Sequence, residues 1–61
     1  MAKFTIYKDL KNEFRWRFIA NNGQIIADSG EGYTSKENCK AGINFVKTNA
    51  PNAPVYDQSG Y

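Results

Sequence analysis

The sequence predicts an α+β fold, in which an antiparallel three-stranded β-meander packs against one α-helix in the order βββα. Three observations predict it. Asn22-Gly23, the strongest short-range signal for a hairpin turn, stands between two segments of alternating residue types. A third alternating segment lies near the N-terminus. Further along the chain, apolar residues recur at spacings of four, three and four, which is typical of one buried helical stripe.

The strands are predicted from residue type and alternation. Lys3–Lys8 (KFTIYK) is rich in β-branched and aromatic residues and is the first strand. A three-residue loop follows it and ends at Asn12, which tolerates the left-handed conformation. The second strand is predicted over Glu13–Ala20, and the third strand over Gln24–Ser29.

These turns determine the predicted register. In the first hairpin the pairs are Phe4 with Phe18, Ile6 with Trp16, and Lys8 with Phe14. A four-residue loop would set Ile6 opposite Arg15, and the apolar pattern rejects it. In the second hairpin a two-residue turn gives the pairs Asn21–Gln24, Ala20–Ile25, Ile19–Ile26, Phe18–Ala27, Arg17–Asp28 and Trp16–Ser29.

The register divides the sheet into two faces. The face that the helix should cover holds Phe4, Ile6, Phe14, Trp16, Phe18, Ala20, Ile25 and Ala27. The opposite face holds Thr5, Tyr7, Arg15, Arg17, Ile19, Ile26 and Asp28. Ile19 and Ile26 are unusual on a solvent-exposed face, because a fully buried Ile gains about 1.5–3 kcal/mol over an exposed one.

The helix is predicted to begin at a capping box and to end before Pro51. Thr34 to Glu37 fits the box with Thr34 as the N-cap, and Ser35 is the alternative cap. The helix should end near Thr48 or Asn49, where Asn49 would take the left-handed conformation. The buried stripe comprises Cys39, Ile43, Val46 and Ala50. The tail over residues 51–61 could add a short strand at Val55–Asp57.

The length predicts a single domain over residues 1–61, with its core in about residues 3–50. Such a chain buries a small fraction of its surface, so its core is marginal. Cys39 is the single cysteine and the chain has no histidine, which excludes an internal disulfide and a zinc site. A high aromatic content and self-association remain as means to stabilise so small a core, and we expect a two-fold homodimer. The candidate dimer contacts are Ile19, Ile26 and Phe45, which lies off the helical stripe.

The net charge of +2 is too small to indicate nucleic-acid binding by itself. No apolar run approaches the roughly 20 residues of a membrane span, which argues against a membrane partner. Lys3 and Lys8 bracket only four residues, so the N-terminus lacks the apolar region of a secretory signal. The sequence therefore predicts a cytoplasmic protein with a reduced thiol.

Several motifs resemble a small bacterial family of unknown function, the YegP-like family (DUF1508 or UPF0339). The resemblance covers nearly everything except the last few residues. The matching residues are Phe4, Tyr7, Asp9, Asn12, Phe14, Arg15, Trp16, Arg17, Phe18, Asn22, Gly23, Ile25, Ile26, Ser29, Tyr33, Ser35, Lys36, Gly42, Ile43, Val46, Lys47, Asn49 and Ala50. Asn12 replaces a commoner Gly, and Phe45 stands where smaller or polar residues are usual.

The resemblance implies antiparallel strands packed with a helix. It also implies self-pairing, because several members are tandem duplications of this unit and a single-repeat chain would imitate them by pairing with a second copy. It implies no activity.

The best polar constellation is a candidate binding face of Tyr7, Arg15, Arg17 and Asp28. One reading is a single-stranded nucleic-acid site, in which guanidinium groups bind phosphate and Tyr7 stacks on a base. The other is structural, with an Arg17–Asp28 ion pair and Arg15 stacked on Tyr7. An exposed ion pair is worth about 0–1 kcal/mol and a stacked pair about 0.5–1 kcal/mol. The structural or dimer-interface reading leads.

Two further motifs carry little chemistry. Residues 30–36 have the outline of an anion cradle, with Lys36 as a loose substitute for a phosphate-loop lysine, but Glu31 would repel an anion. Cys39 has no histidine to activate it and falls on the buried stripe, and the acidic residues are scattered. We therefore predict no catalytic residue, metal or cofactor. The leading function is a non-enzymatic assembly or interaction module. The alternatives are a weak single-stranded nucleic-acid binder that uses Tyr7, Arg15 and Arg17, and a module that binds a small anion at Gly30–Lys36.

Overall fold

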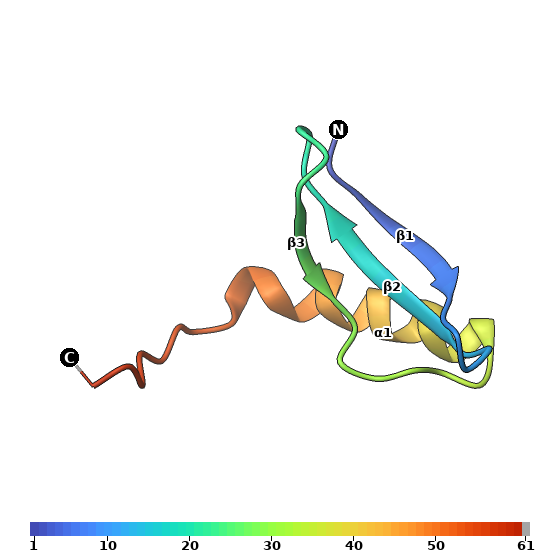
Figure 1. Ribbon diagram of the computed structural model, residues 1–61. Coiled ribbons are helices and arrows are strands. Elements are labelled where there is room, and N and C mark those ends of the chain that lie inside the picture. Colours follow the sequence, from blue (N-terminus) through green and yellow to red (C-terminus); the bar gives the residue numbers. More distant parts are fainter. Residues whose placement is uncertain (61) are drawn as a thin grey trace.

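The computed structural model describes residues 1–60 (Figure 1). Strands β1 (Lys3–Lys8), β2 (Phe14–Ile19) and β3 (Ile25–Asp28) form one antiparallel sheet in the order β1-β2-β3. Helix α1 spans Lys36–Asn49, and the short 3-10 segment η1 spans Ala50–Asn52. The predicted α+β architecture with the order βββα is therefore confirmed.

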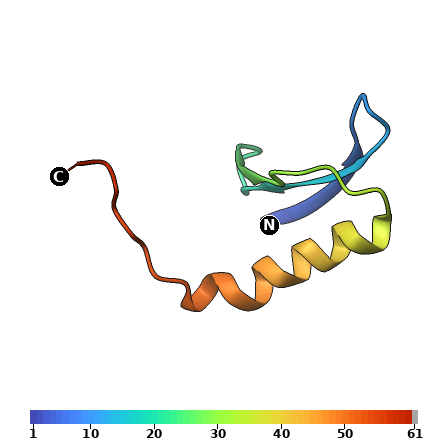
Figure 2. The ribbon, with the colours of Figure 1, turned by 90° about the horizontal axis from the view of Figure 1, so that it is seen from below.

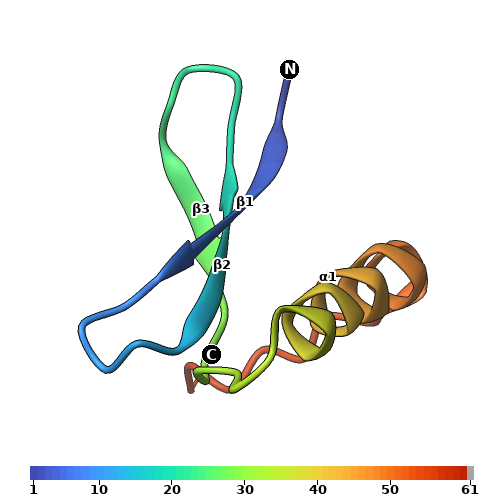
Figure 3. The same ribbon diagram turned by 90° about the vertical axis from the view of Figure 1, so that its right-hand side faces the viewer.

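The sheet and the helix form two layers. Helix α1 runs beneath the sheet in Figure 2, and Figure 3, which looks along α1, shows the loop from β3 crossing to the start of the helix. Within residues 1–60, the buried apolar side chains are Trp16, Cys39 and Ile43. Six half-buried residues pack around them: Phe4, Ile6, Phe14, Phe18, Tyr33 and Val46. The core is small, as the length predicts.

The first hairpin has the predicted register. Phe4 lies opposite Phe18, Ile6 opposite Trp16 and Lys8 opposite Phe14. The backbone N–H of Asp9 donates to the Glu13 carbonyl over 2.9 Å, which closes a three-residue loop. Asn12 has φ 65°, the left-handed conformation that the sequence predicts for it.

The second hairpin differs from the prediction beside its turn. The N–H of Ala20 donates to the Gln24 carbonyl over 2.9 Å, so the loop holds three residues instead of two. Ile26 is then the extra residue of a β-bulge, beyond which the predicted register returns. The observed pairs are Ile19–Ile25, Phe18–Ala27 and Arg17–Asp28. The predicted pairs Asn21–Gln24, Ala20–Ile25 and Ile19–Ile26 are wrong.

The conformation of the turn explains the longer loop. A two-residue type I′ turn needs positive φ at both central residues, but only Gly23 (φ 87°) has it. The Asn22 side chain instead accepts a hydrogen bond from the N–H of Gln24 over 3.0 Å. As a result Ile25 pairs with Ile19 on the outer face of the sheet, and its predicted place under the helix is wrong.

The boundaries of the helix confirm the alternative cap. The Ser35 hydroxyl accepts from the N–H of Asn38 over 3.1 Å, so Ser35 is the N-cap and Thr34 is not. Asn49 has φ −101°, so the predicted left-handed stop is wrong and the chain continues into η1. The Asn49 amide donates back to the Phe45 carbonyl over 2.9 Å. The predicted short strand at Val55–Asp57 is absent, and this segment is extended and unpaired within residues 1–60.

Tyr33 connects the loop before α1 to the sheet. Its backbone N–H and carbonyl form two hydrogen bonds of 2.8 Å with Phe14 of β2. Its hydroxyl reaches the helix at Gly42, where a Cβ would lie 2.5 Å from the oxygen. Tyr33 therefore joins the two layers at the end where the chain passes from sheet to helix.

Candidate functional site

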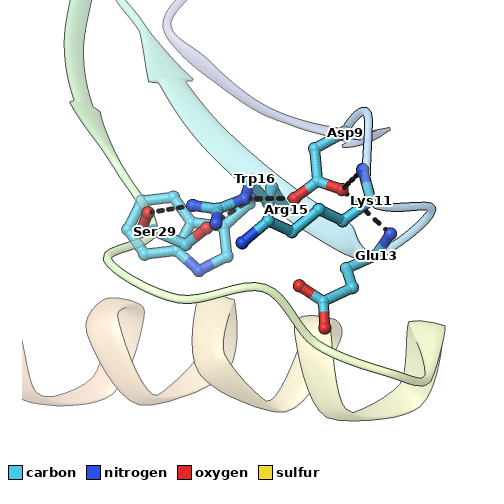
Figure 4. A network of polar contacts seen from close by, with 6 residues as sticks. All are labelled: Asp9, Lys11, Glu13, Arg15, Trp16 and Ser29. Atoms are coloured by element: carbon cyan, nitrogen blue, oxygen red, sulfur yellow. Dashed lines mark hydrogen bonds and ion pairs between the residues drawn. The ribbon is translucent and has the colours of Figure 1, made fainter.

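Asp9 organises the turn between β1 and β2 (Figure 4). One carboxylate oxygen accepts from the backbone N–H groups of Lys11 (2.9 Å) and Glu13 (3.0 Å). The other accepts from the Nε of Arg15 over 2.6 Å, and this ion pair is partly shielded from water. The second arm of the Arg15 guanidinium donates to the Ser29 carbonyl over 3.5 Å. Arg15 therefore ties the turn to the end of β3.

The ion pair shifts the pKa of both partners. The Arg15 side chain, followed by the backbone N–H of Glu13, lowers the pKa of the Asp9 carboxyl below its usual value. The Asp9 carboxylate raises the pKa of Arg15 in turn. Both groups favour the charged form at neutral pH, so the guanidinium of Arg15 is committed to the turn.

Arg17 lies over the ring of Tyr7, with its guanidinium carbon 4.1 Å from the ring centre. The predicted contacts of the two arginines are therefore wrong. Arg15 pairs with Asp9 instead of stacking on Tyr7. Arg17 stacks on Tyr7, its diagonal neighbour in the sheet, instead of pairing with Asp28. Asp28 lies opposite Arg17 but forms no ion pair within residues 1–60. Asp9 is the residue that the sequence reasoning missed as an ion-pair partner. The signal that could have found Asp9 is that it is one of the residues that match the family pattern.

A basic hollow of about 530 Å³ lies beside this turn. It is lined by Tyr7, Lys8, Asp9, Leu10, Lys11, Arg15 and Arg17. Four of these residues are cationic and one is anionic. Since Arg15 neutralises Asp9, the positive charges of Lys8, Lys11 and Arg17 remain, and such a surface attracts phosphate groups.

A second, apolar groove opens between the sheet and the C-terminal half of the helix. It has a volume of about 440 Å³ and is lined by Phe4, Trp16, Phe18, Ala27, Val46, Lys47, Ala50 and Pro51. Phe4 forms its aromatic wall, edge-on to Trp16 with ring centres 5.5 Å apart and tilted against Phe18 at 4.8 Å. Ala27 and Ala50 are exposed although the predicted faces bury them, because the groove separates the two layers here.

The candidate dimer contacts do not form one patch. Ile19 is half-buried, Ile26 is 58% exposed, and both lie on the sheet face away from the helix. Phe45 is 68% exposed. It follows the buried Ile43 by two residues, about 200° around the helix, and therefore faces away from the sheet. These side chains thus lie on opposite outer faces of the molecule.

The loop over residues 30–36 offers little to an anion. The Ser35 hydroxyl already accepts one of the free N–H groups at the start of α1. The Lys36 ammonium lies over the Phe14 ring, 5.8 Å from its centre. Glu31 is exposed in the same loop.

The groups that catalysis would use are dispersed in residues 1–60. Cys39 is fully buried, as the sequence predicts, and burial raises the pKa of its thiol. No group of three Cys, Asp or Glu side chains in this part of the chain could hold a metal ion. In the same range, no helix is both long and apolar enough to span a bilayer.

We expect the Asp9→Asn variant to be less thermally stable than the parent chain at neutral pH. We also expect its thermal stability to change less as the pH falls. Because folding lowers the pKa of Asp9, its stabilising effect is complete above the unfolded pKa of about 3.9 and is lost as the pH falls through the folded pKa. Thermal melts between pH 7 and pH 2 measure this effect. Asp28→Asn removes an exposed carboxylate that has no ion-pair partner within residues 1–60, and it should change the profile little. Identical profiles for the two variants would contradict the prediction.

Comparison with known proteins identifies relatives of the whole unit. The pattern of a domain of unknown function, DUF1508, matches residues 9–57. A UPF0339 protein of Treponema denticola is 53% identical over 56 residues, which cover 92% of this chain and 95% of the relative. The solution structure of a Haloferax volcanii protein has a TM-score of 0.88 and 50% identity, over 92% of this chain and 93% of that one. This archaeal relative extends the similarity beyond the bacteria that the sequence resemblance implies.

One relative is longer. A UPF0339 protein of Stutzerimonas stutzeri is 49% identical over 55 residues, which cover 90% of this chain but 49% of the relative. Its remaining length is enough for a second unit of the same size.

Proposed function

The chain belongs to the DUF1508 family, and from this premise we propose that it is a non-enzymatic interaction module that self-associates as a two-fold homodimer. The observation that carries the proposal is the open apolar groove beside a small core, in which residues 1–60 bury three apolar side chains. A chain of 61 residues gains little from so small a core. A partner that covers the groove would complete the core and stabilise both subunits.

A second copy of the chain is the partner that the observations support. The longer Stutzerimonas stutzeri relative has room for two such units in one polypeptide, where each would have the other as a neighbour. A stable interface buries about 800 Å² on each partner. The surface of the chain is 5096 Å², so the interface would cover about a sixth of it.

The groove fits a closed dimer better than the outer faces do. A two-fold interface uses the same patch on both subunits. Ile26 and Phe45 lie on opposite outer faces, so a contact between them would join copies head to tail into rings or open chains and not into a two-fold dimer. The groove is one continuous patch, and we assign the primary contact to it.

Sedimentation at several concentrations tests the proposal. We expect the mass to rise from 6.9 kDa toward twice that value at high micromolar concentration. Ala50→Glu places a charge in the groove and should weaken association about tenfold or more, since a buried unpaired charge is costly. Ala41→Glu, at an exposed helical position outside the groove, is the matched control. A chain that stays monomeric throughout would refute the proposal.

The basic hollow supports a second candidate function, weak binding of single-stranded nucleic acid. Arg17 stacked on Tyr7 resembles the cation and aromatic combination that binds phosphate and base together. Contact of three phosphates with Lys8, Lys11 and Arg17 would give a salt slope of about −2, at about −0.7 for each phosphate.

Titration of labelled single-stranded RNA at two salt concentrations tests this function. Lys11→Ala/Arg17→Ala should reduce the slope to about −0.7 without disturbing the Asp9–Arg15 pair. Lys3→Ala/Lys40→Ala removes the same charge at exposed positions outside the hollow and the groove, and serves as the control. Absence of binding at low salt, or equal effects of both variants, would exclude the hollow as an RNA site.

A further inference from the structure

We infer that the two copies exchange C-terminal arms, so that residues 53–57 of each chain lie in the apolar groove of the other. The inference rests on the proposed self-association and names the segment that fills the groove. Its first support is that these residues belong to the domain, because the DUF1508 pattern extends through Asp57. Yet Val55 is 94% exposed and Tyr56 is 81% exposed, and the arm runs away from the body of the molecule (Figure 1).

The chemistry of the arm matches that of the groove. Val55 and Tyr56 are apolar side chains exposed to water, and the groove is a predominantly apolar surface without a cover. Lys47 is the single charged residue that lines the groove, and Asp57 follows Tyr56 in the arm. Docking would therefore bury the apolar pair and bring opposite charges together at the rim.

The geometry of the backbone directs the arm away from its own groove. The segment η1 continues the course of α1, and Ala53 is extended with φ −76° and ψ 130°. Ala53 precedes Pro54, which disfavours the helical conformation that a tight reversal would use. Because the groove already includes Ala50 and Pro51, the arm would have to turn back at once to enter it. A second copy requires no reversal.

The arm is long enough for this role. Five extended residues span about 17 Å, and the two outer strands of a three-stranded sheet lie about 10 Å apart. The arm is therefore longer than the sheet is wide. Reciprocal docking places each arm in the other groove by the same two-fold operation, so the assembly closes at two copies.

Charge substitutions in the arm test the inference. Val55→Asp/Tyr56→Asp should raise the dimer dissociation constant about tenfold or more, because the apolar contact is lost. The control Asn52→Asp/Gln58→Asp adds the same charge on either side of the arm and should change it by less than about threefold. These residues are exposed in the monomer, so circular dichroism should show unchanged folding.

A spin label locates the arm directly. Since Cys39 is fully buried, a nitroxide reagent should react selectively with the cysteine of a Gln58→Cys variant in the native state. The labelled ¹⁴N chain is mixed with ¹⁵N chain that carries no nitroxide. We expect broadening of the amide signals of Ala27 and Ala50 in the ¹⁵N chain. A dimer without this broadening, or one unaffected by the arm charges, would overturn arm exchange and leave self-association standing. A chain of residues 1–61 that remains monomeric would overturn both.

Discussion

The Trp16→Ala variant is expected to lose much or all of the stability of the fold. Trp16 is 7% exposed and is the largest of the three buried apolar side chains. Truncation of a buried aromatic residue to alanine costs about 3–5 kcal/mol. A domain of 61 residues has a total stability of about 3–9 kcal/mol, so the loss would remove much or all of it.

The Trp16→Phe variant distinguishes the contribution of the aromatic ring to stability from that of the indole N–H. Phenylalanine keeps an aromatic edge for Phe4, whose ring centre lies 5.5 Å away. It also removes the indole N–H, which is buried without a hydrogen-bond partner in residues 1–60. We therefore expect Trp16→Phe to retain a cooperative melt and to lose far less stability than Trp16→Ala.

Far-UV circular dichroism melts measure both Trp16 variants. Tyr56→Ala removes an exposed aromatic side chain and should leave the monomer melt unchanged. A cooperative Trp16→Ala melt near that of the parent chain would show that Trp16 does not hold the layers together.

The strand phases were predictable because turn chemistry and alternation agree. A loop ending at Asn12 sets Phe4, Ile6 and Trp16 on one face, whereas a four-residue loop would set Arg15 opposite Ile6. The second turn was not predictable to the residue. A two-residue turn and a three-residue turn with one bulge use the same number of residues between Phe18 and Ala27. Both keep the aromatic residues in phase, so the hydrophobic pattern cannot distinguish them.

Side-chain partners were less predictable than strand register. A register places Arg15 opposite Tyr7, but long side chains also reach diagonal neighbours and residues of the adjacent turn. Asp9 accepts two backbone N–H groups and is therefore held where it competes for Arg15. The open groove was also beyond the sequence pattern. Periodicity shows which side chains face the other layer but not how far away that layer lies.

Gly42→Ala is expected to destabilise the fold, although alanine is the better helix former. At an open helical position this substitution would gain about 1 kcal/mol. At position 42 the added Cβ would lie 2.5 Å from the Tyr33 hydroxyl oxygen and 3.1 Å from the ring carbon that carries it. The Tyr33 backbone is fixed by two hydrogen bonds to Phe14, so the ring cannot withdraw freely. Such overpacking costs about 1–3 kcal/mol, which exceeds the propensity gain over most of that range.

A double-mutant cycle tests this cause of the destabilisation. Tyr33→Phe removes the closest atom, so Gly42→Ala should cost less in that background than in the parent chain. Gly30→Ala is the control, because no atom lies within 4 Å of its added Cβ and its φ is not positive. Urea unfolding gives the four free energies of the cycle. Zero coupling between positions 33 and 42, or a stabilised Gly42→Ala variant, would contradict this cause. It would mean that the Tyr33 hydroxyl does not lie close enough to Gly42 to clash with an added Cβ.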